Sequence, residues 1–195
     1  MINQILFISS AYLIGSLSFG IIISKFLNLN DPRTIGSKNP GATNVLRMGN
    51  KVAAILTLLG DILKATIVVS IAIIMDLNEL EIMQISLAVL LGHMYPIYYK
   101  FKGGKGVATY VGILCSINIM FGIVFGICWL VTFFISKFSS LSSLIGSFSV
   151  PVYLLLFDTA GNEIFFGIMF ILIFYTHREN IKRLINKEEN KTKIY

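Results

Sequence analysis

Glycines and lysines gather in the stretch FKGGKGVATY at residues 101–110 of a chain that is otherwise rich in apolar residues. Glycine lets backbone N–H groups approach an anion closely, and the side chains of Lys and Arg can neutralise its charge. These residue types predict a phosphate site. The stretch is not a P-loop, because Tyr99 and Gly106 stand where that motif needs glycine and Ser or Thr. A tight turn is the alternative interpretation of such a loop taken alone.

Two further segments contain glycine and serine at a predicted helix start: TIGSKNPGATNVLRMGNK at 34–51, which also contains asparagine, and the serine-rich FSSLSSLIGS at 138–147. In the first, the Asn39-Pro40 pair predicts the start of a membrane-crossing helix, although Thr43 or Asn44 could equally be the N-cap. A helix N-terminus offers free N–H groups and about half a positive charge. Three such starts on one face favour phosphate binding over turns alone.

The segment THRENIKRL at 176–184 ends the last apolar run. On a helix, His177 and Asn180 are three positions apart and share a face, with Arg178 and Glu179 turned away. Taken alone, His177 could instead be a cation that satisfies the helix dipole, and the same alternative holds for His93.

Asp61 and Lys64 are also three positions apart, inside an apolar run. A charge there costs about 2.5–3.5 kcal/mol on insertion scales. We therefore expect a mutual ion pair that faces the helix bundle, with either a structural role or a place in a site.

The whole chain of 195 residues is 55% hydrophobic and has a mean hydropathy of +0.79, which indicates one membrane-embedded domain, 1–195. A bilayer needs about 20 apolar residues per helix. The sequence predicts an all-α, polytopic protein with seven transmembrane helices, at about 4–24, 52–75, 82–99, 106–117, 119–136, 140–157 and 163–176. Five or six spans are the alternatives, because the run 106–136 gives two short halves with Asn118 as the expected fold-back point.

Charge predicts the orientation. With seven spans and the N-terminus outside, all the Lys and Arg residues except Lys64 fall on the inner side. The outer loops contain no Lys or Arg, and their charged residues are all acidic: Asp76, Glu79, Glu81, Asp158 and Glu163. This asymmetry places the C-terminus in the cytoplasm. Basic residues spread over such loops argue against nucleic-acid binding, and the tail after Lys182 is expected to meet anionic lipid headgroups.

Other features are predicted to be structural. Residues 1–24 resemble a retained first span rather than a signal peptide, and Gly15, Ser16, Ser18 and Gly20 are expected to permit close helix packing. Cys115 and Cys128 are expected to be packing residues without a disulfide. Because no ligand cluster suggests a metal, we expect neither metal nor other cofactor.

The blocks YLIGSLSFG, GSKNPGATNVLR, GHMYPIYYKFKGGKGVAT and HRENIKRL follow one another across nearly the whole chain. In this order they resemble the signature blocks of the bacterial membrane acyl-phosphate:glycerol-3-phosphate acyltransferases, the PlsY family. The chain departs from that pattern at Ser18, Lys38 and Ala65, where the family usually has proline, glycine and glycine. These differences affect helix packing and loop shape, not a charged site residue.

The resemblance implies a seven-span enzyme of the bacterial cell membrane (the inner membrane if Gram-negative), with its active site facing the cytoplasm. It implies transfer of a fatty acyl group from acyl phosphate to the 1-hydroxyl of glycerol 3-phosphate, giving lysophosphatidic acid and phosphate, without acyl-CoA or acyl carrier protein as donor. Its implied partners are these two substrates, membrane lipids and the soluble enzyme that makes acyl phosphate. Soluble-headed acyltransferases use histidine with aspartate five positions later, but Tyr98 and Lys182 occupy those positions after His93 and His177.

Given these implied substrates, a cationic site should hold two phosphates. The expected phosphate-binding residues are Ser37, Arg47, Lys105, Ser143 and Asn180, with Gly103, Gly104 and Gly106 shaping the loop and Thr43 and Asn44 as supporting donors. The expected catalytic residues are His177, Asn180 and Lys105. No Ser or Cys has a recognisable base and orienting partner, so direct attack of the hydroxyl without an acyl-enzyme is predicted. Either His177 or a substrate phosphate oxygen could accept the proton.

A phosphate or organophosphate transporter is the main competing function, and a non-catalytic scaffold or lipid-binding membrane protein would not explain three glycine-lined helix starts together. A transporter would place its binding groups near the middle of the membrane in broken helices related by inverted repeats. Here the cationic groups are expected at one membrane interface. The similarity between LIGSLS at 13–18 and LIGSFS at 144–149 is too short to establish a repeat.

Overall fold

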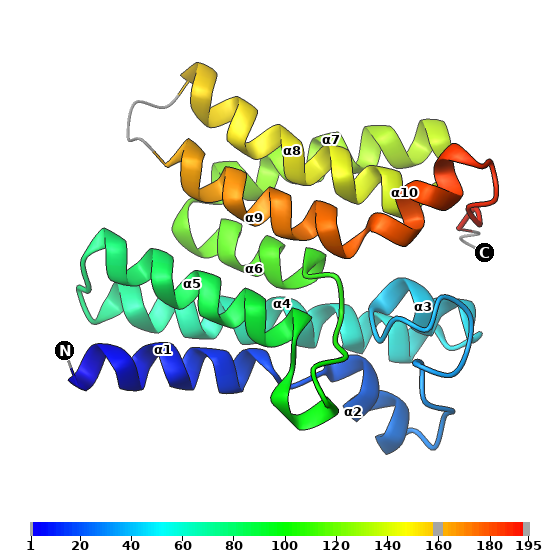
Figure 1. Ribbon diagram of the computed structural model, residues 1–195, viewed down its shortest axis with the longest axis horizontal. Helices are drawn as coiled ribbons and strands as arrows, with labels where there is room; N and C mark the ends of the chain where they lie inside the picture. The colour runs from blue at the N-terminus through cyan, green and yellow to red at the C-terminus, as the bar shows by residue number, and fades with distance from the viewer. Residues whose placement is uncertain (1, 158–161, 193–195) are drawn as a thin grey trace. The chain divides into compact units, whose positions relative to one another are not determined.

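In the computed structural model, the ranges 2–157 and 162–192 are described, and they contain helices and no strand. The predicted outer residue Asp158 and the tail residue Lys193 lie outside these ranges. The helices, in chain order, are α1 (Ile2–Gly15), α2 (Phe19–Phe26), α3 (Ala42–Arg47), α4 (Lys51–Ile74), α5 (Glu79–Met94), the short 3₁₀ turn η1 (Ile97–Tyr99), α6 (Val107–Ile117), α7 (Ile119–Ser136), α8 (Ser139–Phe157), α9 (Glu163–Thr176) and α10 (Arg178–Ile185). Figure 1 shows them coloured along the chain.

Several of these helices have the length and composition of membrane spans. Among the described residues, α4, the stretch Glu79–Tyr99, α7 and α8 are each long and apolar enough to cross a bilayer. The bent pairs α1–α2 and α9–α10 raise the number to six if each is one span, and α6 is shorter. The all-helical, apolar class is confirmed, while seven spans and their orientation stay predictions.

The chain divides into two compact units, one ending at Ile117 and the other starting at Asn118. This boundary falls at the residue where the sequence predicts a break in the run 106–136. Asn118 stops the helical run because it is extended and its side chain accepts a hydrogen bond from the backbone of Met120, 2.9 Å away, as the N-cap of α7. Whether 1–195 acts as one domain stays a prediction.

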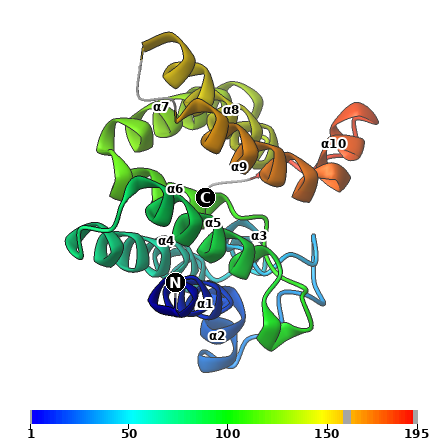
Figure 2. The ribbon, with the colours of Figure 1, turned by 60° about the vertical axis from the view of Figure 1, so that its left-hand side comes forward.

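In the first unit, α4 packs against α5 and α6, and α1 packs against α5 (Figure 2). Glycine makes the α1–α5 crossing close: a Cβ at Gly15 would meet the backbone of Val89, and one at Gly92 would meet the carbonyl of Tyr12. The predicted packing role of Gly15 is therefore confirmed. The core between these helices contains small and β-branched side chains such as Ala65 and Val69, both fully buried.

The first predicted span, 4–24, is not one straight helix. It ends at Gly15, restarts at Phe19 and bends by 45°. Two features interrupt the backbone hydrogen bonds of the helix: Ser18 is extended, and the carbonyl of Leu17 accepts a hydrogen bond from Lys64 Nζ at 2.6 Å. A side-chain ammonium thus takes a carbonyl that a continuous helix would use internally.

The predicted helix start at Asn39-Pro40 is wrong, and so are the alternative caps Thr43 and Asn44. The six-residue helix α3 starts after Gly41 and ends at Arg47. The long helix α4 starts separately at Lys51, where Asn50 is the N-cap and accepts from the backbone of Ala53 at 2.8 Å. Several polar residues in this segment are compatible with a cap, and local propensity does not decide which of them closes the turn.

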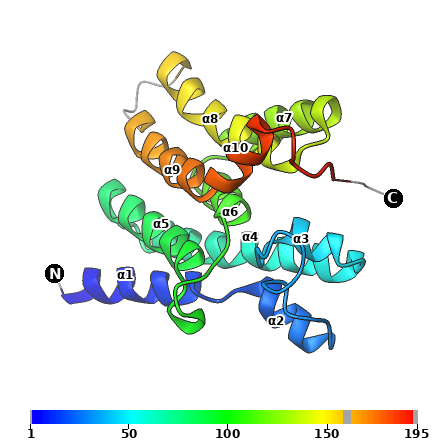
Figure 3. The same ribbon diagram turned by 45° about the vertical axis from the view of Figure 1, so that its right-hand side comes forward.

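In the second unit, α8 packs against both α7 and α9. Aromatic rings also join α7 and α9: Phe121 of α7 and Phe166 of α9 meet edge to face with centroids 5.5 Å apart. The axis bends by 63° between α9 and α10. Figure 3 shows the change of direction between these two helices. After α10 the chain returns to α7–α8, where the backbone of Thr192 donates to the carbonyl of Lys137 at 2.9 Å.

Candidate active site

The loop before α3 is organised by a buried amide. Asn44 is 1% exposed, and its Nδ2 donates to the carbonyls of Pro32 at 2.7 Å and Ile35 at 3.0 Å. Its Oδ1 accepts from the backbone N–H of Ser37 at 2.9 Å. Gly36, with φ of +61°, lets the chain turn beside that oxygen, where a Cβ would clash. One side chain therefore fixes the loop that carries Ser37.

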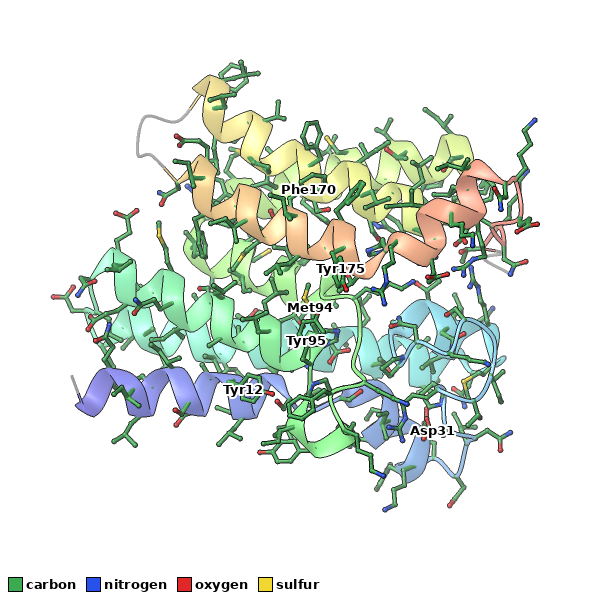
Figure 4. All side chains as sticks on the ribbon, in the orientation of Figure 1. Tyr12, Asp31, Met94, Tyr95, Phe170 and Tyr175 are labelled. Atoms are coloured by element: carbon green, nitrogen blue, oxygen red, sulfur yellow. The ribbon has the colours of Figure 1, made fainter. Side chains whose placement is uncertain are left out.

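An ion pair closes the same loop on its other side. The Arg33 guanidinium contacts both carboxylate oxygens of Asp31, at 2.6 Å for the shortest pair, and lies 5.6 Å from the ring centroid of Tyr99. Hydrogen bonds from Arg33 hold the pKa of Asp31 below its usual value, although partial burial acts in the opposite direction. Asp31 lies beyond the end of α2 in Figure 4.

The remaining candidates of this segment lie on α3. Arg47 is exposed in its last turn, and Thr43 is half-buried in its first turn. Arg47 therefore follows the loop that carries Ser37 and lies on a helix of only six residues.

The glycine-rich loop lies against the end of α5. Gly104 donates its N–H to the carbonyl of His93 at 3.0 Å. A Cβ at Gly103 would clash with that same carbonyl, and one at Gly106 would clash with Met94. The chain reverses just before this loop, where Lys100 and Phe101 both take left-handed conformations. Half-buried Lys105 therefore lies in a loop whose backbone is fixed by these contacts, two residues before the start of α6.

Tyrosine contacts attach this region to α1. Tyr12 donates its hydroxyl to the carbonyl of Tyr95 at 2.7 Å, and Figure 4 shows Tyr12, Met94 and Tyr95 near one another. The backbone of Ile97 approaches Ser16 Oγ at 3.4 Å. The segment from α5 to α6 thus lies beside the α1–α2 break.

Three ionisable side chains meet inside the first unit. The predicted ion pair is confirmed: Lys64 Nζ and Asp61 Oδ1 are 2.9 Å apart and both side chains are almost fully buried. His93 joins them, with Nδ1 at 2.9 Å from Lys64 Nζ and 3.5 Å from Asp61 Oδ1. The sequence analysis missed His93 as a third member, since no periodicity links α4 to the end of α5.

In the second unit, Ser143 is buried within α8. Its Oγ donates to the carbonyl of Ser139 at 2.8 Å and accepts from Trp129 Nε1 at 3.2 Å. The hydroxyl proton is thus held by the backbone one turn earlier. To bind a phosphate as a donor, the hydroxyl would have to rotate away from that carbonyl.

His177 lies at the bend between α9 and α10. As expected, His177 and Asn180 share a face and are 2% and 4% exposed, whereas Arg178 and Glu179 are exposed. Nδ1 of His177 lies 2.8 Å from the carbonyl of Ile173. A carbonyl only accepts, so Nδ1 carries a proton, and in the neutral ring Nε2 carries the lone pair.

The structure adds Glu189, which the sequence analysis missed. Its carboxylate accepts from Asn180 Nδ2 at 2.8 Å, Ser140 Oγ at 3.0 Å and Arg183 Nε at 2.7 Å. Burial acts to raise the pKa of Glu189, but these hydrogen bonds outweigh it and hold the pKa below its usual value. A carboxylate from the chain end therefore orients the amide of Asn180.

The structure thus groups the predicted residues unit by unit. The first unit contains Ser37, Thr43, Asn44, Arg47 and the loop 103–106. The second unit contains Ser143, His177 and Asn180. Within the described ranges, no cluster of three His, Cys, Asp or Glu side chains could hold a metal.

Comparison with known proteins identifies the family. The family model described as glycerol-3-phosphate acyltransferase matches residues 5–187. A glycerol-3-phosphate acyltransferase of Pelagibacter ubique is 60% identical over 95% of this chain and 96% of its own length, and that of Ruthia magnifica is 48% identical over 98% and 99%.

Solved structures agree with these sequence relatives. The crystal structure of PlsY, an integral membrane glycerol 3-phosphate acyltransferase, in its glycerol 3-phosphate form has a TM-score of 0.91 and 34% identity, covering 97% of this chain and 95% of that one. Its lysophosphatidic acid form has a TM-score of 0.89 and 33% identity. The chain is therefore an acyltransferase that belongs to the glycerol-3-phosphate acyltransferase family, the family of PlsY.

Proposed function

We propose that this protein transfers a fatty acyl group from acyl phosphate to the 1-hydroxyl of glycerol 3-phosphate, and that it releases lysophosphatidic acid and phosphate. The names of the relatives support the acceptor, and the two crystal forms of PlsY support both the acceptor and the product. The acyl-phosphate donor comes from the resemblance of the sequence blocks. The reaction takes place at the cytoplasmic face of the bacterial cell membrane, where the soluble enzyme that makes acyl phosphate can deliver it.

One observation carries this proposal: the glycine-rich loop 103–106 is fixed on the end of α5 and displays Lys105 directly before α6. The N–H of Gly104 is bonded to the His93 carbonyl, so in this proposal an anion approaches the other N–H groups of the glycine-rich loop, and the ammonium group of Lys105 supplies charge. In this role Lys105, Arg47 and Ser37 bind phosphate in the first unit, while Ser143 and Asn180 bind phosphate in the second. Thr43 supports them, and Asn44 acts by holding the loop, because both N–H groups of its amide are used by backbone carbonyls.

The chemistry proceeds by direct attack. The acceptor hydroxyl oxygen attacks the carbonyl carbon of acyl phosphate, the ester bond forms, and the bond between that carbon and the phosphate oxygen breaks. The mixed anhydride is already activated, so the protein positions two anions and stabilises the departing phosphate. A covalent acyl-Ser143 is disfavoured because the hydroxyl proton of Ser143 is given to a backbone carbonyl rather than to a base.

The hydroxyl proton has two candidate acceptors. Because the Ile173 carbonyl holds Nδ1–H of His177, the neutral ring keeps its lone pair on Nε2, as a general base requires. A phosphate oxygen of the substrate is the other acceptor, in which case His177 orients that phosphate.

The test supplies the purified protein with glycerol 3-phosphate and one donor at a time: synthetic acyl phosphate, acyl-CoA or acyl carrier protein loaded with a fatty acid. We expect lysophosphatidic acid only with acyl phosphate. Equal product from acyl-CoA would overturn the proposed donor, and absence of product from all three donors would overturn the reaction itself.

A further inference from the structure

The buried cluster of Asp61, Lys64 and His93 has a fixed hydrogen-bond direction. Lys64 Nζ donates to the Leu17 carbonyl at 2.6 Å and to His93 Nδ1 at 2.9 Å, and it forms an ion pair with Asp61 Oδ1, 2.9 Å away. An ammonium group has three N–H bonds to donate and nothing to accept with. Lys64 therefore donates toward His93 Nδ1 and accepts nothing from it.

This arrangement determines which nitrogen of His93 carries the proton. Nδ1 accepts from Lys64, so the hydrogen of the neutral ring is on Nε2. Nδ1 lies farther from Asp61 Oδ1, at 3.5 Å, than from Lys64 Nζ, at 2.9 Å, which favours the contact with Lys64. His93 consequently presents an N–H donor at the end of its ring that points away from the cluster.

That donor end faces the glycine-rich loop. A Cβ built at Gly104 would clash with Nε2 of His93, so only glycine at this position makes room for this end of the ring. His93 is 7% exposed, and Nε2 is not among the fully buried polar atoms that lack a partner in the ranges that the structure describes. This end of the ring therefore keeps contact with solvent, where a ligand oxygen can accept from its N–H.

We propose that Nε2–H of His93 is a further phosphate-binding donor, which hydrogen-bonds an oxygen of the phosphate held by the loop 103–106. The ligand class is a phosphate monoester or an acyl phosphate. Asp61 and Lys64 are positioning residues in this proposal, since they hold the ring in the donating tautomer. The inference rests on the proposed function in one respect, namely that the loop binds a substrate phosphate.

Two substitutions separate the two ends of the ring. His93→Asn keeps an acceptor where Nδ1 was but removes the donor at Nε2, whereas His93→Gln places an amide donor near the Nε2 position and removes the acceptor for Lys64. We expect His93→Asn to raise KM for one or both phosphate substrates about 10-fold to 100-fold, the cost of losing a hydrogen bond to a charged group. His93→Gln should recover most of that affinity and yet unfold at a lower temperature in detergent than His93→Asn.

KM is measured separately for glycerol 3-phosphate and for acyl phosphate, so an effect on one alone identifies whose phosphate is held. The proposal is overturned if His93→Asn keeps the wild-type KM for both, or if both variants lose affinity equally. If His93 had only a structural role, the less stable variant, His93→Gln, would also have the higher KM. The proposal expects the opposite, with the higher KM in His93→Asn.

A measurement on the unsubstituted chain covers the case in which the variants do not fold. With ¹⁵N-labelled histidine, addition of glycerol 3-phosphate to the full-length protein should move the Nε2 resonance of His93, which is assigned by its absence in a His93→Phe chain or by its coupling within the ring. An unmoved Nε2 resonance at saturating glycerol 3-phosphate and at saturating acyl phosphate overturns the proposal. Because this binding signal does not depend on turnover, it can succeed even if the wild type fails to use acyl phosphate, and the two failures are thereby distinguished.

Discussion

Asn180 and Glu189 are joined by a hydrogen bond of 2.8 Å, so that the last described segment of the chain orients a residue of the candidate site. The carboxylate is 4% exposed and also accepts from Ser140 and Arg183. A polar residue of the site is thus held by a charged group that lies outside the four sequence blocks.

The Glu189 contact predicts sensitivity to acid. The pKa of Glu189 in the folded protein lies below its value in the unfolded chain, so its contribution to stability is full above the unfolded value and is lost as pH falls through the folded value. Thermal unfolding in detergent should therefore show a steeper loss of stability between about pH 5 and pH 3 for the wild type than for Glu189→Gln. Exposed Glu188 provides the matched control, Glu188→Gln, and equal acid slopes for all three proteins would contradict the prediction.

The phosphate assignment predicts large kinetic losses from two cations. Arg47→Ala and Lys105→Ala should each lower kcat/KM about 10-fold to 100-fold, because each removes charge-assisted hydrogen bonds to a substrate phosphate. Lys102→Ala is the control, since Lys102 is an exposed lysine of the same loop. Near-normal kinetics for both Arg47→Ala and Lys105→Ala would rule out the assignment.

Asn44→Ala should destabilise the loop that carries Ser37. It removes three hydrogen bonds from a buried amide and leaves backbone groups without partners, for a loss of about 1–3 kcal/mol in the free energy of unfolding. Thr34→Ala, which removes one exposed hydrogen bond to Asp31, is expected to lose less. Equal unfolding temperatures for the two variants would show that Asn44 does not organise this loop.

The buried ion pair predicts a non-additive double substitution. Lys64→Met leaves the Asp61 carboxylate without its ammonium partner, a loss of about 3–5 kcal/mol, while Asp61→Leu together with Lys64→Met removes both charges and should lose less than the two single losses combined. Unfolding temperatures of the two single variants and the double variant measure this difference. Strictly additive losses would mean that the two charges do not stabilise each other.

His177→Asn tests where the acceptor hydroxyl proton goes. The substitution can keep a donor for the Ile173 carbonyl but removes the nitrogen at Nε2. If His177 is the general base, kcat should fall about 10²-fold to 10⁴-fold and the loss of rate at acid pH should disappear from the pH profile. A smaller fall with an unchanged profile would assign the proton to a substrate phosphate.

Local sequence determined much of this protein. Long apolar runs predict the helices α4, α7 and α8 because a helix satisfies its backbone hydrogen bonds internally in lipid. Spacing of three positions predicts both the Asp61–Lys64 pair and the shared face of His177 and Asn180, because helix geometry alone brings such residues together. The ordered blocks predict the family.

The tertiary structure decided what depends on contacts between distant segments. Lys64 reaches the Leu17 carbonyl, which ends α1 early, and His93 completes the charged cluster from another helix. Glu189 reaches Asn180 because the chain turns back after α10. No periodicity encodes such contacts, since they depend on which helix faces pack and on where an unpaired buried charge finds its partner.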